Sequence, residues 1–215
     1  NVLSYLKPGD LILRDLGFQV ISVQRLLISN GVFLISRKKF GTKIYDEKSG
    51  KELTFKKLLG KKGWFDGYVL VGKTEQLKMR MVVTALPKDK ANERRRKERK
   101  NRDKRMNHSL EYYNQLGYTI LLTNVPAEIC SRKEIGQVYG LRWRIETIFK
   151  TWKSHFSLEE IIPNECKNPY RITCVIYLML LQIIIFQIIW MNHYTNENKL
   201  KEGERYFSLM KLAKF

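Results

Sequence analysis

The stretch that decides the fold is Tyr139-Gly140-Leu141-Arg142-Trp143-Arg144-Ile145-Glu146-Thr147-Ile148-Phe149-Lys150-Thr151-Trp152-Lys153. Apolar residues recur in it at three- and four-residue steps and neither Gly nor Pro follows Gly140, so the pattern predicts an amphipathic helix. Tyr139, Arg142, Glu146 and Lys153 share one stripe of this helix, because spacings of three, four and seven match the helical repeat. The helix therefore offers one carboxylate flanked by a phenol, a guanidinium and an ammonium.

This stripe has two interpretations. One is a solvated surface helix with Arg and Glu pairs, each worth a few tenths of a kcal/mol. The other is a metal-binding carboxylate set among cations that hold phosphates, because hard cations prefer carboxylate oxygens and guanidinium groups suit a phosphodiester. The spacing alone leaves both open.

The stretch closely resembles the Tyr-x2-Arg-x3-Glu-x6-Lys signature of the DDE transposases encoded by bacterial insertion sequences. All four signature residues are present at the family's spacing, and the intervening Arg-Trp-Arg-Ile-Glu is also typical of the family. The resemblance implies that Glu146 is a catalytic residue and a metal ligand. It further implies that Tyr139, Arg142 and Lys153 bind and position DNA.

The composition points to a polyanionic partner. The 215 residues are 44% hydrophobic, and 40 Lys and Arg against 21 Asp and Glu give a formal net charge of +19. Such an excess repels itself unless a polyanion offsets it, which makes nucleic acid the first expectation and a membrane surface the second. The three Cys are odd in number and have no metal-ligand spacing, which argues against a disulfide framework or a zinc site and fits a reducing cytoplasm.

A second acidic residue follows a short apolar run near the start of the chain. Residues 10–14 read as a buried strand, and Asp15-Leu16-Gly17-Phe18 follows it. An Asp at the carboxyl end of a strand, before a Gly that lets the chain turn sharply, is where α/β proteins commonly present ligands. The alternative is that Asp15 only caps the next helix, expected at 19–29. The resemblance implies that Asp15 is the second catalytic Asp of the family and a metal ligand.

The resemblance also implies the fold class, which is α/β and ribonuclease H-like with a β-rich insertion between the Asp15 strand region and the Glu146 helix. We expect the core to be partial, because the family's first catalytic Asp and its N-terminal strands have no counterpart here. Asp10 lies too close to Asp15 to replace that residue. The expected domains are a first core segment at 1–36, the basic insertion at 37–118, a second core segment at 119–191 and a C-terminal tail at 192–215.

Within the insertion, the sequence predicts short strands with exposed, basic outer faces at 42–45, 52–56, 68–72 and 78–85. Residues 88–105 carry eleven Lys and Arg against four Asp and Glu, a balance of +7, and nothing apolar larger than Ala. This run is either a solvated helix or disordered tether, or a direct contact to phosphates.

After the insertion, residues 118–124 predict a strand that Pro126 ends, and Ser131 with Glu134 predicts a capping box at the start of the signature helix. Residues 174–191 carry no formal charge and touch the lower length limit of a membrane span. Because Gln182 and Gln187 interrupt this segment, we expect a buried helix packed on the sheet instead.

The resemblance implies a DNA transposase fragment that cleaves and transfers DNA strands at insertion-sequence ends. Asp15 and Glu146 would hold two Mg²⁺ or Mn²⁺ ions that activate the nucleophile and stabilise the leaving oxygen. The expected partner is double-stranded DNA, both transposon ends and target, bound by a homodimer in a synaptic complex in the bacterial cytoplasm at the nucleoid. We expect no membrane and no small-molecule substrate, and little activity from these residues alone, since the first catalytic Asp is absent.

Three other functions stay open. A ribonuclease H-like nuclease or resolvase would share the carboxylates without needing the Tyr, Arg and Lys stripe. A non-catalytic, basic DNA-binding remnant of a transposase would have lost catalysis with the first Asp. A membrane-surface protein is the third alternative.

Overall fold

The computed structural model describes residues 2–101, 108–144, 146–147, 150 and 168–197. The chain divides into two compact units, residues 1–140 and residues 141–215. The first unit contains a sheet with helices, and the second contains the long apolar helix. Lys153 lies outside the described residues.

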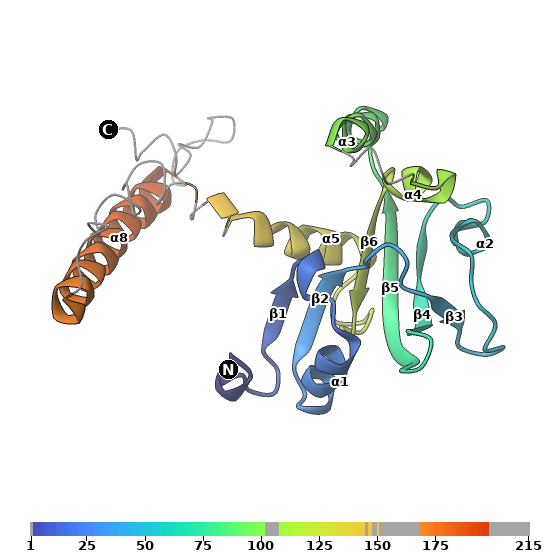
Figure 1. The fold of residues 1–215 in the computed structure, drawn as a ribbon, viewed down its shortest axis with the longest axis horizontal. Helices are drawn as coiled ribbons and strands as arrows, with labels where there is room; N and C mark the ends of the chain where they lie inside the picture. Colours follow the sequence, from blue (N-terminus) through green and yellow to red (C-terminus); the bar gives the residue numbers. More distant parts are fainter. Residues whose placement is uncertain (1, 102–107, 145, 148–149, 151–167, 198–215) are drawn as a thin grey trace. The chain divides into compact units, whose positions relative to one another are not determined.

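The first unit is built on one six-stranded sheet, which Figure 1 shows with its helices. In spatial order the strands are β1 (Leu11–Arg14), β2 (Phe33–Arg37), β6 (Tyr118–Thr123), β5 (Leu77–Ala85), β4 (Phe65–Val71) and β3 (Ile44–Asp46). The β1–β2 pair is parallel and the other pairs are antiparallel. The expected α/β class is therefore confirmed as a mixed sheet with helices.

The parallel pair is closed by a helical crossover, because parallel strands need a long connection. A short 3-10 helix, η2 (Leu16–Phe18), follows β1 and leads into α1 (Ile21–Ser29), which returns the chain to β2. Asn30 caps α1, and Gly31 adopts a φ of +71°, a left-handed conformation that favours Gly. A second 3-10 helix, η1 (Val2–Tyr5), precedes β1.

The strands of the expected insertion continue the same sheet. β5 pairs with β6 from Arg80↔Thr123 to Ala85↔Tyr118, and β4 pairs with β5 along its whole length. The expected exposed outer faces are wrong for β5, because its central positions are buried on both sides of the sheet. One core contains Leu34, Val69, Val83 and Leu122, and the other contains Ile35, Val82, Leu121 and Ile135. The domain boundaries stay a prediction.

One expected strand is a helix. Residues 52–56 contribute only an isolated bridge at Glu52, and α2 (Phe55–Leu59) begins inside the range. Thr54 caps this helix through its hydroxyl, which accepts a hydrogen bond from the backbone nitrogen of Lys57 at 3.4 Å. Phe55, Leu58 and Leu59 are buried, and their i, i+3, i+4 spacing is the helical signal that favours α2 over a strand.

The basic run forms α3 (Lys88–Asn101), directly after β5, and α4 (Leu110–Gln115) precedes β6. Both helices lie at one end of the sheet, opposite α1 (Figure 1). A helix is therefore confirmed for 88–101, and residues 102–105 lie outside the described residues.

The signature stretch does not form one continuous helix. α5 (Arg132–Gly140) starts with the expected capping box, in which the Ser131 nitrogen donates to the Glu134 carboxylate at 2.8 Å. It ends at Gly140, the poorest helix former of the stretch. Helical residues resume at Arg142, past the boundary between the two units. The expected single helix over 139–153 is therefore wrong at its start.

The second unit contains α8 (Pro169–Glu197), which starts before the expected apolar segment and extends into the expected tail. Residues Pro169–Ile189 have a mean hydropathy of 2.5, so this helix is long and apolar enough to cross a membrane by length and composition alone. Core helices of other proteins share these properties. Most of its apolar side chains are exposed, although Ile183 is buried. Packing against the sheet stays a prediction.

Candidate functional site

Asp15 lies where the sequence predicts, directly after β1, and its side chain is half-buried. It occupies the position before η2 but makes no capping hydrogen bond there, and α1 has Val20 at its own cap position. The helix-capping alternative for Asp15 is therefore wrong. Gly17 has no positive φ and a Cβ would meet no atom within 4 Å, so the turn does not require this Gly.

Tyr139 lies beside this strand end, although 125 positions separate it from its partner. Its ring is buried among the residues of the second core, and its hydroxyl donates a hydrogen bond to the Arg14 carbonyl at 3.3 Å. The first signature residue thus fixes the end of α5 to the residue that precedes Asp15. Its expected contact with DNA stays a prediction.

The second unit holds Arg142 and Glu146 one helical turn apart. An Arg142 Nη1 atom lies 2.5 Å from the Glu146 Oε1 atom, and the carboxylate is the more exposed partner. A charge-assisted hydrogen bond at this distance restricts the carboxylate's rotation. Asp15 and Glu146 lie in different units, so their convergence on one metal site stays a prediction.

The donor chemistry of these two carboxylates suits a hard cation such as Mg²⁺, which prefers oxygen ligands. Among the residues that the structure describes, no three His, Cys, Asp or Glu side chains are grouped as a metal site would need. A site with Asp15 and Glu146 would thus have to be completed by further oxygen donors.

Two polar residues at the end of β6, Thr123 and Asn124, bond to β2 and the residue before it. The Asn124 side chain accepts from the Leu34 nitrogen at 2.8 Å and donates to the Val32 carbonyl at 3.0 Å. The Thr123 hydroxyl donates to the Leu34 carbonyl at 2.7 Å. The bonds of Asn124 extend the pairing of β6 with β2 past the end of β6. They stabilise the strand with which β1 pairs.

Sequence reasoning missed a buried arginine beside the loop that precedes α5. Arg80 is 1% exposed and grips Asp66 through two bonds of 2.7 and 2.8 Å. Its Nη1 atom also donates to the Cys130 carbonyl at 2.7 Å and to the Val125 carbonyl at 3.2 Å. Arg80 therefore fixes the loop from which α5 starts. The sequence signal that could have indicated this buried charge is a single Arg between Met79 and Met81 in an apolar run.

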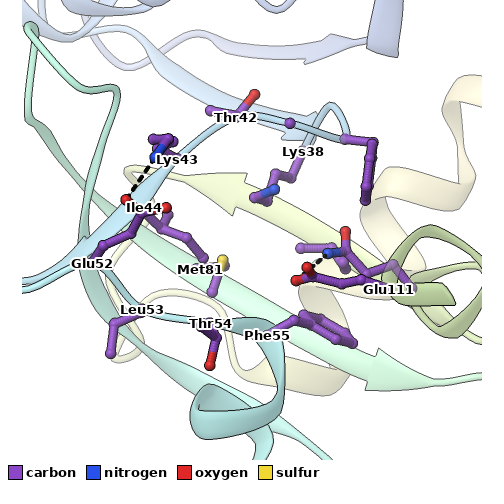
Figure 2. A pocket seen from close by; sticks show the side chains of 14 residues that line it. Lys38, Thr42, Lys43, Ile44, Glu52, Leu53, Thr54, Phe55, Met81 and Glu111 are labelled. Carbon is purple, nitrogen blue, oxygen red and sulfur yellow. Dashed lines mark hydrogen bonds and ion pairs between the residues drawn. The ribbon is translucent and has the colours of Figure 1, made fainter. Parts of the chain in front are cut away.

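A pocket of about 180 Å³ lies under the segment that follows β2 (Figure 2). Lys38 and Glu111 line it together with Thr42, Phe55 and Met81. Burial lowers the pKa of Lys38 to about 8, and the Glu111 carboxylate opposes this effect. No motif in the sequence marks this lysine.

Comparisons with known proteins find a matching family model and several relatives. A family model described as "Transposase DDE domain" matches residues 2–180. The transposase for insertion sequence element IS231C of Bacillus thuringiensis subsp. berliner is 29% identical over 207 residues, which cover 86% of this chain and 42% of that protein. The transposase for IS1151 of Clostridium perfringens is 24% identical, with 82% and 41% covered. The chain thus spans about two fifths of the length of these curated relatives.

Proposed function

Because the chain belongs to the family of transposase DDE domains, we propose that it is the C-terminal portion of a catalytic domain that cuts and transfers DNA strands at insertion-sequence ends. The family implies a ribonuclease H-like fold, to which a parallel β1–β2 pair within a mixed sheet is suited. β1 and β2 would then belong to the core, and β3 to β5 to the insertion.

One observation carries the proposal. Tyr139, the first signature residue, is bonded to the Arg14 carbonyl, one residue before Asp15. Two motifs that are far apart in the sequence are thereby joined at the carboxyl end of a strand, the usual ligand-binding position in α/β sheets.

In the proposed mechanism, Asp15 and Glu146 are two of the carboxylates that hold Mg²⁺ or Mn²⁺. The bound ions would activate the attacking hydroxyl and stabilise the leaving oxygen. Arg142 would orient the Glu146 carboxylate, to which it is already bonded, and contact a DNA phosphate together with Lys153. A third carboxylate is needed, and β1 has no strand partner on its outer edge among the described residues, so a strand bearing that carboxylate can pair there.

The proposed partners follow from this chemistry. They are double-stranded DNA, as transposon ends and target, and a second copy of the protein in a synaptic complex. The relatives are bacterial proteins, and a DNA substrate places the reaction in the cytoplasm at the nucleoid.

Manganese binding tests the two carboxylates without relying on activity. We expect Asp15→Asn and Glu146→Gln each to weaken Mn²⁺ binding at least about tenfold, because even outer-shell ligand losses cost about 10–100-fold. The measurement is the electron paramagnetic resonance signal of free Mn²⁺ during titration of the 215-residue chain. Glu128→Gln, at an exposed carboxylate, is the control. Unchanged binding in both site variants would contradict the proposal.

A second experiment tests the missing carboxylate. Supplying a preceding segment that carries the first catalytic Asp should produce Mg²⁺-dependent cleavage of a DNA duplex bearing the element's ends. Glu146→Gln should abolish this cleavage while DNA binding persists. A lack of any gain would count against the assignment.

A further inference from the structure

The basic helix α3 and Asp15 lie at the same end of the sheet. The pairs Arg14↔Ser36 and Arg37↔Leu121 place the carboxyl ends of β1 and β2 beside the start of β6. The pair Ala85↔Tyr118 adds the carboxyl end of β5, from which α3 follows. β1 and β5 are three strand positions apart, or about 15 Å at the usual strand spacing.

α3 is docked at this end by its inner face. Ala91 is buried, Arg94 donates to the Tyr118 carbonyl at 3.5 Å, and Arg95 donates to the Tyr113 carbonyl at 3.1 Å. Carbonyl acceptors fix these arginines without neutralising their charge. The docking therefore determines which side chains of α3 face outward.

The outward face of α3 is rich in cations, although Asp89 and Glu93 share it, since they precede Arg96 by seven and three positions. An open depression of about 480 Å³ is lined by Asn92, Arg96, Arg99 and Lys100, together with Arg95, whose Nε atom bonds inward to the Tyr113 carbonyl. Two of the acids are paired, since Glu93 lies 2.9 Å from Lys97 and Glu98 lies 3.6 Å from His108. Over its whole length α3 has eight Lys and Arg against three Asp and Glu. Arg96 and Lys100 have no ion-pair partner among the residues that the structure describes. They are separated by about 6 Å along the helix axis.

Further cations continue from α3 towards Asp15. Burial lowers the pKa of Arg94, and the positive charge of Arg37, at the end of β2, lowers it further. Burial also lowers the pKa of Arg14, which precedes Asp15. An excess of like charge drawn together at one end of the sheet favours a polyanionic partner.

We propose that this end of the sheet binds the phosphate backbone of duplex DNA, with Arg96 and Lys100 of α3 as the main contacts and the duplex running from α3 towards Asp15. The inference rests on the proposed function and names the DNA-binding surface of that site. Cations at this spacing contact phosphates and carry no base readout, so the binding is independent of sequence. The distance of about 15 Å to β1 corresponds to about four to five base pairs at 3.4 Å each.

The experiment compares two double variants with the same loss of charge. Arg96→Gln with Lys100→Gln removes two cations of α3, and Gln preserves helix propensity. Lys7→Gln with Lys73→Gln removes two exposed cations before β1 and in the β4–β5 turn, which lie at the opposite end of the sheet. Binding of a labelled duplex of mixed sequence is measured by fluorescence anisotropy over a range of salt concentrations.

We expect the α3 double variant to lower the slope of log K against log salt by about 2, because each lost phosphate contact contributes about 0.9. The control double variant should change the slope by less than about 1. Equal changes in the two variants, an unchanged slope in the α3 variant, or no duplex binding by the parent chain would each overturn the inference. Mn²⁺ binding that still depends on Asp15 and Glu146 would then leave the proposed function standing.

Discussion

Two arginine-bearing regions of the first unit use the same side chain in opposite ways. The buried Arg80 of β5 donates four hydrogen bonds, two of them to the oxygens of Asp66 and two to backbone carbonyls. On the surface helix α3, Arg94 and Arg95 bond to backbone carbonyls and not to a carboxylate. The hydrogen bond and charge of Asp66 raise the pKa of Arg80, whereas burial lowers that of Arg94. A charge matched inside the fold contributes to stability, and an unmatched charge is available to a partner.

The largest expected effect comes from breaking the matched site. Arg80→Met leaves the Asp66 carboxylate without its cation and releases the Val125 and Cys130 carbonyls. Loss of one partner of a buried pair typically costs about 3–5 kcal/mol of unfolding free energy. Urea denaturation followed by circular dichroism measures this loss. The double variant Arg80→Met with Asp66→Leu should be less destabilised than the single one, since no charge stays buried alone. Equal stability of Arg80→Met and the parent would show that the pair does not stabilise the fold.

Lys38 lies between the matched charge of Arg80 and the unmatched charges of α3. Burial lowers its pKa, and the Glu111 carboxylate only partly offsets this effect. Its pKa of about 8 in the folded chain lies below the value near 10.5 expected in the unfolded chain. Between these values the unfolded state binds more protons, so the unfolding free energy should rise as the pH increases from 8 to 10.5. Lys38→Met should remove this rise and stabilise the chain below pH 8 by about 1–3 kcal/mol. Urea denaturation across this pH range checks it, and a parallel rise in parent and variant would contradict it.

The smallest effects separate the two faces of α3. Arg95→Gln should cost about 1 kcal/mol of unfolding free energy, because it removes a bond to the Tyr113 carbonyl. Arg96→Gln should stay within about 0.5 kcal/mol of the parent, since its side chain is exposed. Denaturation midpoints of the two variants make the comparison. Equal midpoints would mean that the inner face does not hold the helix.

Local signals predicted much of the fold. The apolar runs gave β1 and β6 within a residue, and the Ser131 and Glu134 pair marked the start of α5. α2 was missed because its five residues are too short for the helical period to stand out. The single sheet was missed because strand pairing is a long-range property that local patterns do not encode.

The candidate site also has features that the sequence predicts and features that it does not. The position of Asp15 at a strand end is local, and the sequence predicts it. The bond from Tyr139 to the Arg14 carbonyl and the contacts of Arg80 join residues far apart in the chain, and they depend on the path of the whole sheet. α5 ends at Gly140 because Gly is a weak helix former. This Gly lies at the boundary between the two units, and the apolar pattern of the sequence does not reveal that boundary.

The Tyr139 bond has a consequence for the timing of synthesis. A ribosome adds about 5–20 residues per second, so the 125 positions between donor and acceptor take roughly 6–25 s to translate. During that interval the nascent polypeptide already displays Asp15 but lacks the tyrosine that braces its strand. A product that terminates early, between Asp15 and Tyr139, therefore carries an acidic residue whose strand end has not yet received its tyrosine brace.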